Sequence, residues 1–192
     1  MAAILEKLQG GDRRSLGRSR EAVAEALRNP AAFNKLFAAL SSEDPVVRAR
    51  SADAAEKVSR SRPEMLQPFK QQLLNALPLV EQCEVRWHVA QMLPRLVMNE
   101  AELSAAVDAL YCFLNDESKI VQVNAMQALA DIAAAHTELQ DELRQLFAAR
   151  ATTGSAAVRA RARKLATQLA GAQIRTRKGN VKAKRSPRAK AQ

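Results

Sequence analysis

The chain has 192 residues, a formal net charge of +10 and aromatic side chains at only 4% of its positions. Its length suits one domain with a real core, which must be built from Ala, Leu, Val, Ile and Met. Strong helix formers dominate, residues 18–153 contain no glycine, and no stretch shows sustained β-branched alternation. These features exclude a β-rich fold and predict an all-α protein.

The positive charge lies at the C-terminal end. Residues 150–192 hold thirteen Lys or Arg and no acidic residue, whereas residues 1–149 hold seventeen basic and twenty acidic residues. Electrostatic attraction to a partner would therefore start from the C-terminal end and not from the body of the chain.

The predicted elements are helices separated by short turns. Asn29-Pro30 and Asp44-Pro45 each put a capping side chain before a first-turn proline, and Gly171 is expected to end the last helix. Asn99-x-x-Glu102 and Thr137-x-x-Gln140 have the spacing of capping boxes. In chain order, the expected helices span residues 2–9, 18–28, 31–40, 44–58, 63–77, 83–96, 100–114, 118–132, 137–149 and 155–170.

Four of these helices repeat one pattern. Anchor valines at 47, 85, 121 and 158 are separated by 38, 36 and 37 residues. Apolar or small residues follow at offsets of 4, 7, 8 and 11 in nearly every copy, and these offsets share one face of a helix. Another helix precedes each copy, so the unit is a pair of antiparallel helices, and the chain is predicted to form an α-solenoid.

The repeated pattern resembles the second half of a HEAT repeat. Asp44, Pro45, Val47 and Arg48, followed by alanines and Val58, carry this resemblance, and Arg86 and Arg159 repeat the arginine after the valine. The third copy has Gln122 there, and the second lacks the Asp-Pro turn. The resemblance implies a right-handed α-solenoid of about four pairs. The expected organisation is N-terminal capping helices at 1–29, repeats at 30–171 (30–60, 63–97, 99–135, 137–170) and a disordered basic tail at 172–192.

The second helices of HEAT repeats line a concave surface, which the resemblance would assign here too. Val85, Val89, Met92, Leu93 and Leu96 fall on one side of their helix, whereas the helical period puts Trp87 about 200° from Val85. Two roles are open for Trp87: packing against a neighbouring repeat or a curled terminus, and binding of a partner. The expected partner-binding residues on this surface are Arg50, Trp87, His88, Gln91, Val123, Asn124 and Gln127.

Rare side chains cluster in residues 83–96 without forming a reaction centre. Cys83 and His88 are five residues apart, so they lie on different helix faces and do not have zinc-ligand spacing. Nothing supplies an orienting group or oxyanion hole for a Cys–His nucleophile. Some HEAT-like proteins are DNA glycosylases, but such a site needs several aromatics around a base. We therefore expect no enzyme, no metal site and no cofactor, and we read the recurring Arg48, Arg86 and Arg159 as structural.

The basic C-terminal end suggests an alternative function for the chain, which is binding to nucleic acid. An arm this charged attracts nucleic-acid phosphates with little sequence preference, although it could equally be a solvated tail. The expected nucleic-acid contacts are Arg159, Arg161, Arg163, Lys164, Arg175, Arg177, Lys178, Lys182, Lys184, Arg185, Arg188 and Lys190.

Two further patterns concern location. Cys83 and Cys112 are too few for a disulfide framework, which favours reduced thiols and a cytoplasmic protein. The first residues carry Glu6 within an apolar run, unlike a secretory signal, and no apolar run has the length of a membrane span. We therefore expect a soluble scaffold that binds a protein partner without inserting into a membrane; the pattern does not indicate an oligomeric state.

Overall fold

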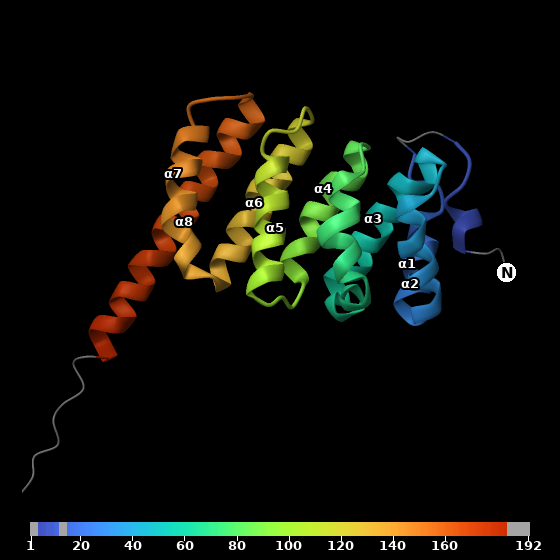
Figure 1. Cartoon of the computed structure of the whole chain (residues 1–192), viewed down its shortest axis with the longest axis horizontal. Coiled ribbons are helices and arrows are strands. Elements are labelled where there is room, and N and C mark those ends of the chain that lie inside the picture. Colours follow the sequence, from blue (N-terminus) through green and yellow to red (C-terminus); the bar gives the residue numbers. More distant parts are fainter. Residues whose placement is uncertain (1–3, 12–14, 184–192) are drawn as a thin grey trace, which may run out of the picture. The chain divides into compact units, whose positions relative to one another are not determined.

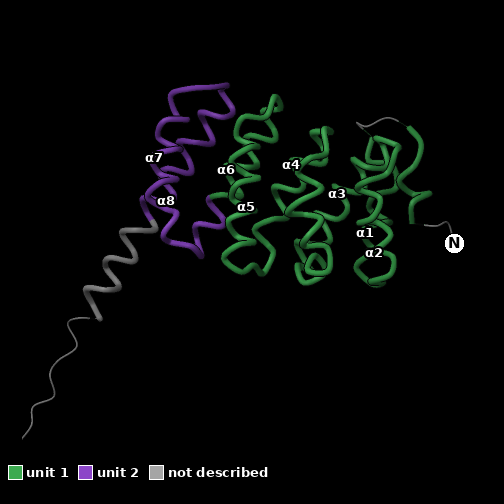
Figure 2. Tube along the Cα trace, viewed as in Figure 1, with its two compact units in different colours: residues 1–129 green, residues 130–192 purple. Residues whose placement is uncertain are grey.

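The computed structural model describes residues 4–11 and 15–183, with side chains described as far as Gly171. Every secondary-structure element in these ranges is helical (Figure 1), as the composition predicts. The chain divides into two compact units, residues 1–129 and 130–192, with the boundary inside helix α6 (Figure 2). None of the described helices has both the length and the apolar character needed to cross a bilayer.

The first unit contains helices η1 to α5 and most of α6. They are η1 (Ile4–Lys7), α1 (Ser19–Arg28), α2 (Pro30–Ala38), η2 (Ala39–Ser41), α3 (Pro45–Ser61), η3 (Pro63–Phe69), η4 (Gln72–Ala76), η5 (Leu77–Leu79), α4 (Cys83–Met92), η6 (Leu93–Arg95), α5 (Glu100–Phe113) and α6 (Lys119–Ala135). The second unit holds the end of α6, then η7 (Thr137–Leu139), α7 (Gln140–Arg150) and α8 (Ala156–Ala183).

The predicted caps begin three of the helices. The Asn29 side chain accepts a hydrogen bond from Ala31 N at 3.0 Å, and the Asp44 side chain accepts one from Val46 N at 2.8 Å. Asn99 and Glu102 form a complete capping box at the start of α5, with both bonds at 2.9 Å. These contacts satisfy amide groups that the first turn of a helix leaves without an intrahelical partner.

The core of the first unit is largely aliphatic and contains one aromatic cluster. Helix α3 packs against both α1 and α4. Phe37 stacks on Phe69 of η3 with ring centroids 4.1 Å apart, and Phe33 meets the same ring edge-on at 5.9 Å. The predicted apolar face of α4 is buried: Val85, Val89, Met92, Leu93 and Leu96 are each at most 7% exposed.

The position after the anchor valine makes the same hydrogen bond in all four aligned helices. Its side chain donates to carbonyls five or six residues earlier, in the turn that leads into its own helix. Gln122 makes this bond where the other helices have arginine, so the third copy keeps the interaction without the charge. The donors are Arg48, Arg86, Gln122 and Arg159, and the acceptors are Ser42 and Glu43, Val80 and Glu81, Asp116, and Gly154, respectively.

Three expected elements differ in the structure because of prolines and a competing side-chain bond. The helix expected at 63–77 is a 3₁₀ helix, a π-helix and another 3₁₀ helix in succession, since Pro68 cannot donate the bond that an α-helix needs there. Pro94 does not kink a continuing helix: α4 ends at Met92 and a 3₁₀ turn follows. The capping box expected at Thr137 is not formed, because the Gln140 side chain donates to Ala133 O at 2.8 Å.

The two ends of the chain also differ from expectation. Among the described residues of the expected helix 2–9, which start at Ile4, the structure has the 3₁₀ helix η1 and no α-helix, and Gly10 and Gly11 follow with positive φ. Helix α8 does not end at Gly171 but continues to Ala183. A glycine costs about 1 kcal/mol in a helix interior, and Gly171 does not have the positive φ that would terminate one. Helix α8 therefore includes residues 172–183 of the expected basic tail, and residues 184–192 lie outside the described residues.

Candidate protein-binding face

Side chains of α4 and α6 form one candidate surface, the α4–α6 face. A hydrogen bond from Gln91 Nε2 to Asn124 Oδ1, 2.9 Å long, joins the two helices. Asn124 Nδ2 in turn donates to Ile120 O at 2.8 Å, which fixes the orientation of the amide. Six of the seven predicted partner-binding residues belong to these two helices: Trp87, His88 and Gln91 on α4, and Val123, Asn124 and Gln127 on α6.

The apolar part of this face stays accessible. Trp87 and Val123 are half-buried, and Ile120, on the same side of α6 as Val123 and Asn124, is 54% exposed. Ile120 was missed from the sequence because it stands one residue before the anchor valine, outside the compared pattern. The signal in the sequence that could have indicated Ile120 was an isoleucine at the expected start of a helix, next to the anchor valine and outside the compared pattern.

His88 is the buried polar centre of the face. It is 9% exposed, its Nδ1 lies 3.0 Å from Gln91 Oε1, and its Nε2 lies 4.0 Å from Asp53 Oδ1. Because Gln91 donates to Asn124 through its nitrogen, its oxygen faces His88 as an acceptor, which places the imidazole proton on Nδ1. Burial lowers the pKa of His88 below its ordinary value, and Asp53 and Gln91 offset this only in part.

The lowered pKa predicts a stability loss on mild acidification. As pH falls through about 6.5, the unfolded chain takes up a proton at this position before the folded chain does, so the free energy of unfolding decreases. The slope is at most about 1.4 kcal/mol per pH unit for one proton, and it disappears below the folded-state pKa. Urea unfolding between pH 8 and pH 5 measures it. His88→Gln should flatten the profile, whereas the same change at the more exposed His136 should leave it intact; equal slopes in both variants would contradict a neutral buried His88.

Ion pairs on α3 and on the 3₁₀ helix η6 border the face. Lys57 Nζ lies 2.6 Å from Asp53 Oδ2. Glu56, with a side chain only 1% exposed, is bound by Arg95 Nη2 at 2.6 Å and by Arg60 Nε at 2.8 Å. Burial opposes ionisation of Glu56, but the two arginine bonds together outweigh it, so the pKa of this carboxyl is lowered. Helices α3 and η6 are thus joined through the buried carboxylate of Glu56.

Arg50 does not belong to this accessible face, contrary to the prediction. It is 3% exposed, and its guanidinium donates to Leu8 O and Ser15 O at 2.8 Å and to Gln9 O at 3.1 Å. The segment before α1 therefore covers the place where the repeat alignment expected an open arginine. The role of Arg50 in the structure is to hold this segment against α3.

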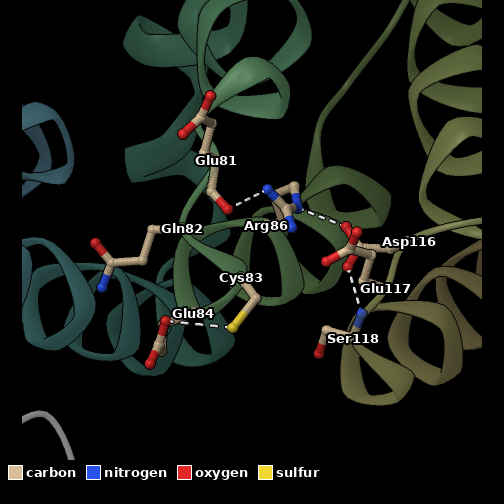
Figure 3. A pocket seen from close by; sticks show the side chains of 8 residues that line it. All are labelled: Glu81, Gln82, Cys83, Glu84, Arg86, Asp116, Glu117 and Ser118. Carbon is tan, nitrogen blue, oxygen red and sulfur yellow. Dashed lines mark hydrogen bonds and ion pairs between the residues drawn. The ribbon is translucent and has the colours of Figure 1, made fainter.

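A pocket of about 440 Å³ lies beside the first turns of α4 and α6 (Figure 3). Arg86 Nε lies 2.6 Å from Asp116 Oδ2, as the structural interpretation of Arg86 predicts. Cys83 also lines the pocket, and its Sγ lies 3.4 Å from Glu84 Oε2. Burial and this carboxylate raise the pKa of the thiol, which works against a nucleophilic thiolate. Within the described residues, no three His, Cys, Asp or Glu side chains are arranged to hold a metal ion.

The predicted nucleic-acid contacts extend along α8. Arg163 and Lys164 are exposed, while Arg159 and Arg161 are half-buried. Arg159 donates to Gly154 O at 2.6 Å, and Arg163 donates to Ala151 O at 3.3 Å. Four more of the predicted residues fall on helical backbone: Arg175, Arg177, Lys178 and Lys182. The remaining four, Lys184, Arg185, Arg188 and Lys190, lie outside the described residues.

Comparison with known proteins bears on the fold alone. No protein-family model matches the chain, and no curated protein does. The chain is similar to an engineered protein whose crystal structure was determined by the Northeast Structural Genomics Consortium, with a TM-score of 0.53 and 18% sequence identity over 88% of this chain and 78% of that chain. This similarity agrees with a fold of packed helices, and the resemblance to HEAT repeats stays a prediction.

Proposed function

We propose that this chain is a non-enzymatic, cytoplasmic scaffold, built as an α-solenoid of HEAT-like helix pairs, that binds a protein partner through the α4–α6 face. The bond between Gln91 and Asn124 carries this proposal, because it aligns the two helices so that apolar and amide side chains share one accessible surface. The shared turn bond at Arg48, Arg86, Gln122 and Arg159 supports the repeat register.

The chemistry of the face suits a peptide or a helix of another protein. Trp87, Val123 and Ile120 supply apolar contact area, and tryptophan is among the residues that most often dominate binding energy at interfaces. Gln91 and Gln127 add groups that both donate and accept hydrogen bonds. A partner with one apolar side and adjacent polar groups would match this arrangement.

The environment of the rare side chains supports a non-enzymatic role. The raised pKa of the Cys83 thiol favours its protonated form. His88 is held by Gln91 and is mostly buried, so its bonds fix a helix face and do not point to a reacting group.

Affinity capture from a nuclease-treated cell extract tests the proposal. The double variant Trp87→Ala/Gln91→Ala is expected to lose the captured protein, with affinity about 30-fold weaker from a hot-spot loss of about 2 kcal/mol. A matched control is Leu79→Ala/Val97→Ala, because Leu79 and Val97 are 82% and 77% exposed and lie outside α4 and α6. Both variants should keep the wild-type helix content by circular dichroism. Capture that survives the first variant, or is lost equally in both, would overturn the assignment of the face.

A further inference from the structure

The α4–α6 face adjoins the pocket at the first turns of its two helices. On α4, Glu84, Trp87 and Gln91 follow one another at spacings of three and four residues, so they fall within about 60° of one another around the helix. Glu84 also lines the pocket (Figure 3). On α6, the exposed Ile120 comes three residues after Glu117, which lines the same pocket. The apolar side chains of the face and the pocket are therefore neighbours on both helices.

Carboxylates outnumber cations in this pocket. Its lining contains four acidic side chains, at Glu81, Glu84, Asp116 and Glu117, and one cation, Arg86. Arg86 Nε lies 2.6 Å from Asp116 Oδ2, so these two charges balance each other. Glu81 and Glu117 are exposed, and Glu84 is half-buried with its Oε2 3.4 Å from the uncharged Cys83 thiol. The pocket thus keeps an excess of negative charge.

The cations beside the pocket do not remove this excess. Lys119, exposed at the first position of α6, offsets at most one carboxylate. Arg48 donates to Gln82 Oε1 at 2.8 Å, but the turn before its own helix carries the exposed acidic residues Glu43 and Asp44. A partner that places positive charge here is therefore attracted, and a partner that places negative charge here is repelled.

We propose that the partner of the α4–α6 face is a basic amphipathic helix. Its apolar side covers Trp87 and Ile120, and a lysine or arginine at its end enters the pocket. This inference rests on the proposed function and adds the chemistry of the partner to it. Since the apolar side chains would fit any amphipathic helix, the carboxylates are what selects the charge of the partner. A guanidinium suits them well, because it binds a carboxylate through two parallel hydrogen bonds.

The apolar part of the face favours a helix over an extended segment. A helix satisfies the hydrogen bonds of its own backbone, so it can cover Trp87, Ile120 and Val123 without leaving amide groups unpaired. An extended segment would place backbone amides over these side chains, which offer apolar area in place of hydrogen-bond partners, and an unpaired buried amide is costly.

Three synthetic helical peptides test the proposal on the full chain by fluorescence anisotropy. They share one leucine and alanine pattern and carry lysine, glutamine or glutamate at the polar positions. At low salt we expect the lysine peptide to bind about tenfold more tightly than the glutamine peptide, and the glutamate peptide to bind most weakly. The difference should shrink at high salt, because salt screens exposed charges. Emission from Trp87, the only tryptophan of the chain, should change when the lysine peptide binds.

Two matched variants locate the charge requirement. Glu84→Gln/Glu117→Gln should weaken binding of the lysine peptide about fivefold, since each exposed ion pair contributes modestly, and should change binding of the glutamine peptide less than about twofold. The control Glu100→Gln/Glu138→Gln removes the same charge from exposed first-turn positions of α5 and η7. It should weaken the lysine peptide less than about twofold.

The other outcomes contradict the proposal in different ways. Equal binding of the lysine and glutamine peptides, lost for both in Trp87→Ala/Gln91→Ala, would overturn the charge requirement and leave the proposed function intact. Lysine-peptide binding that survives Trp87→Ala/Gln91→Ala would separate the pocket from the face. Equal losses in the two glutamate variants would mean attraction by net charge alone. Self-association in analytical ultracentrifugation that salt and Glu84→Gln/Glu117→Gln both abolish would make a second copy of the chain the occupant. Absence of lysine-peptide binding at low salt would reject a basic partner.

Discussion

Replacing Arg95 by methionine is expected to lower the free energy of unfolding by about 3 kcal/mol, because it removes the less exposed of the two arginine partners of a buried carboxylate. Glu56 is 1% exposed on its side chain, and Arg95 binds it at 2.6 Å while also donating to Ser59 Oγ at 2.6 Å. The methionine keeps much of the side-chain volume, so the loss reports on the charge and its hydrogen bonds. Urea denaturation followed by far-ultraviolet circular dichroism measures the change.

Two further variants make this prediction specific. Arg60 binds the same carboxylate oxygen at 2.8 Å but is 61% exposed, so Arg60→Met should cost less than about 1 kcal/mol. Glu56→Gln/Arg95→Met removes the buried charge together with its partner and should be more stable than Arg95→Met alone. An equal cost for the Arg60 and Arg95 variants would show that burial of the pair does not govern its contribution.

Replacing Arg50 by alanine is the second change for which we expect a large effect, about 3 kcal/mol, with loss of order before α1. Its bonds to the carbonyls of Leu8, Gln9 and Ser15 are made by a charged donor at a buried site, and such bonds contribute more than neutral ones. Gly17, with a φ of +51°, approaches so closely that an added Cβ would lie 2.8 Å from Arg50 Nη1. The guanidinium and this loop are therefore fitted to each other.

Limited proteolysis and hydrogen exchange measure the release of the segment. Arg50→Ala should speed cleavage and exchange in residues 4–11 and 15–18 more than in α4, and Arg50→Lys should behave similarly, because an ammonium cannot reproduce the planar fork. Arg28→Ala provides the control, since Arg28 is exposed on α1. Unchanged exchange before α1 in Arg50→Ala would show that other contacts hold this segment.

The helices were predictable where local signals dominate. Side-chain caps at Asn29, Asp44 and Asn99 and the apolar period of α4 are read from neighbouring residues, and the structure confirms them. The irregular helices at 63–79 were not predicted, because the same apolar residues can be buried by α, 3₁₀ or π geometry, and prolines decide among these. The continuation of α8 past Gly171 depends on the propensities of its neighbours and not on the glycine alone.

The repeat pattern predicted which residues of α4 and α6 lie near one another, but it missed Ile120 and misplaced Arg50. The repeat register correctly placed Gln91 and Asn124 near each other, because equivalent positions of adjacent packed helices face the same way. The same register placed Arg50 with them and was wrong, since the carbonyls of Leu8, Gln9 and Ser15 that bind it lie outside the repeat pattern. A long-range contact of this kind depends on the loop conformation, for which Gly10, Gly11 and Gly17 were the only local signals.

Photo-crosslinking from position 120 is the most direct test of the scaffold proposal. A crosslinking amino acid replaces Ile120, which is 54% exposed on the α4–α6 face, and in a parallel protein it replaces Leu79, which is 82% exposed elsewhere. We expect a discrete protein adduct from position 120 that is absent from position 79 and disappears when Trp87→Ala/Gln91→Ala is added. An adduct that forms equally from position 79, or that survives the double variant, would contradict a partner bound on this face.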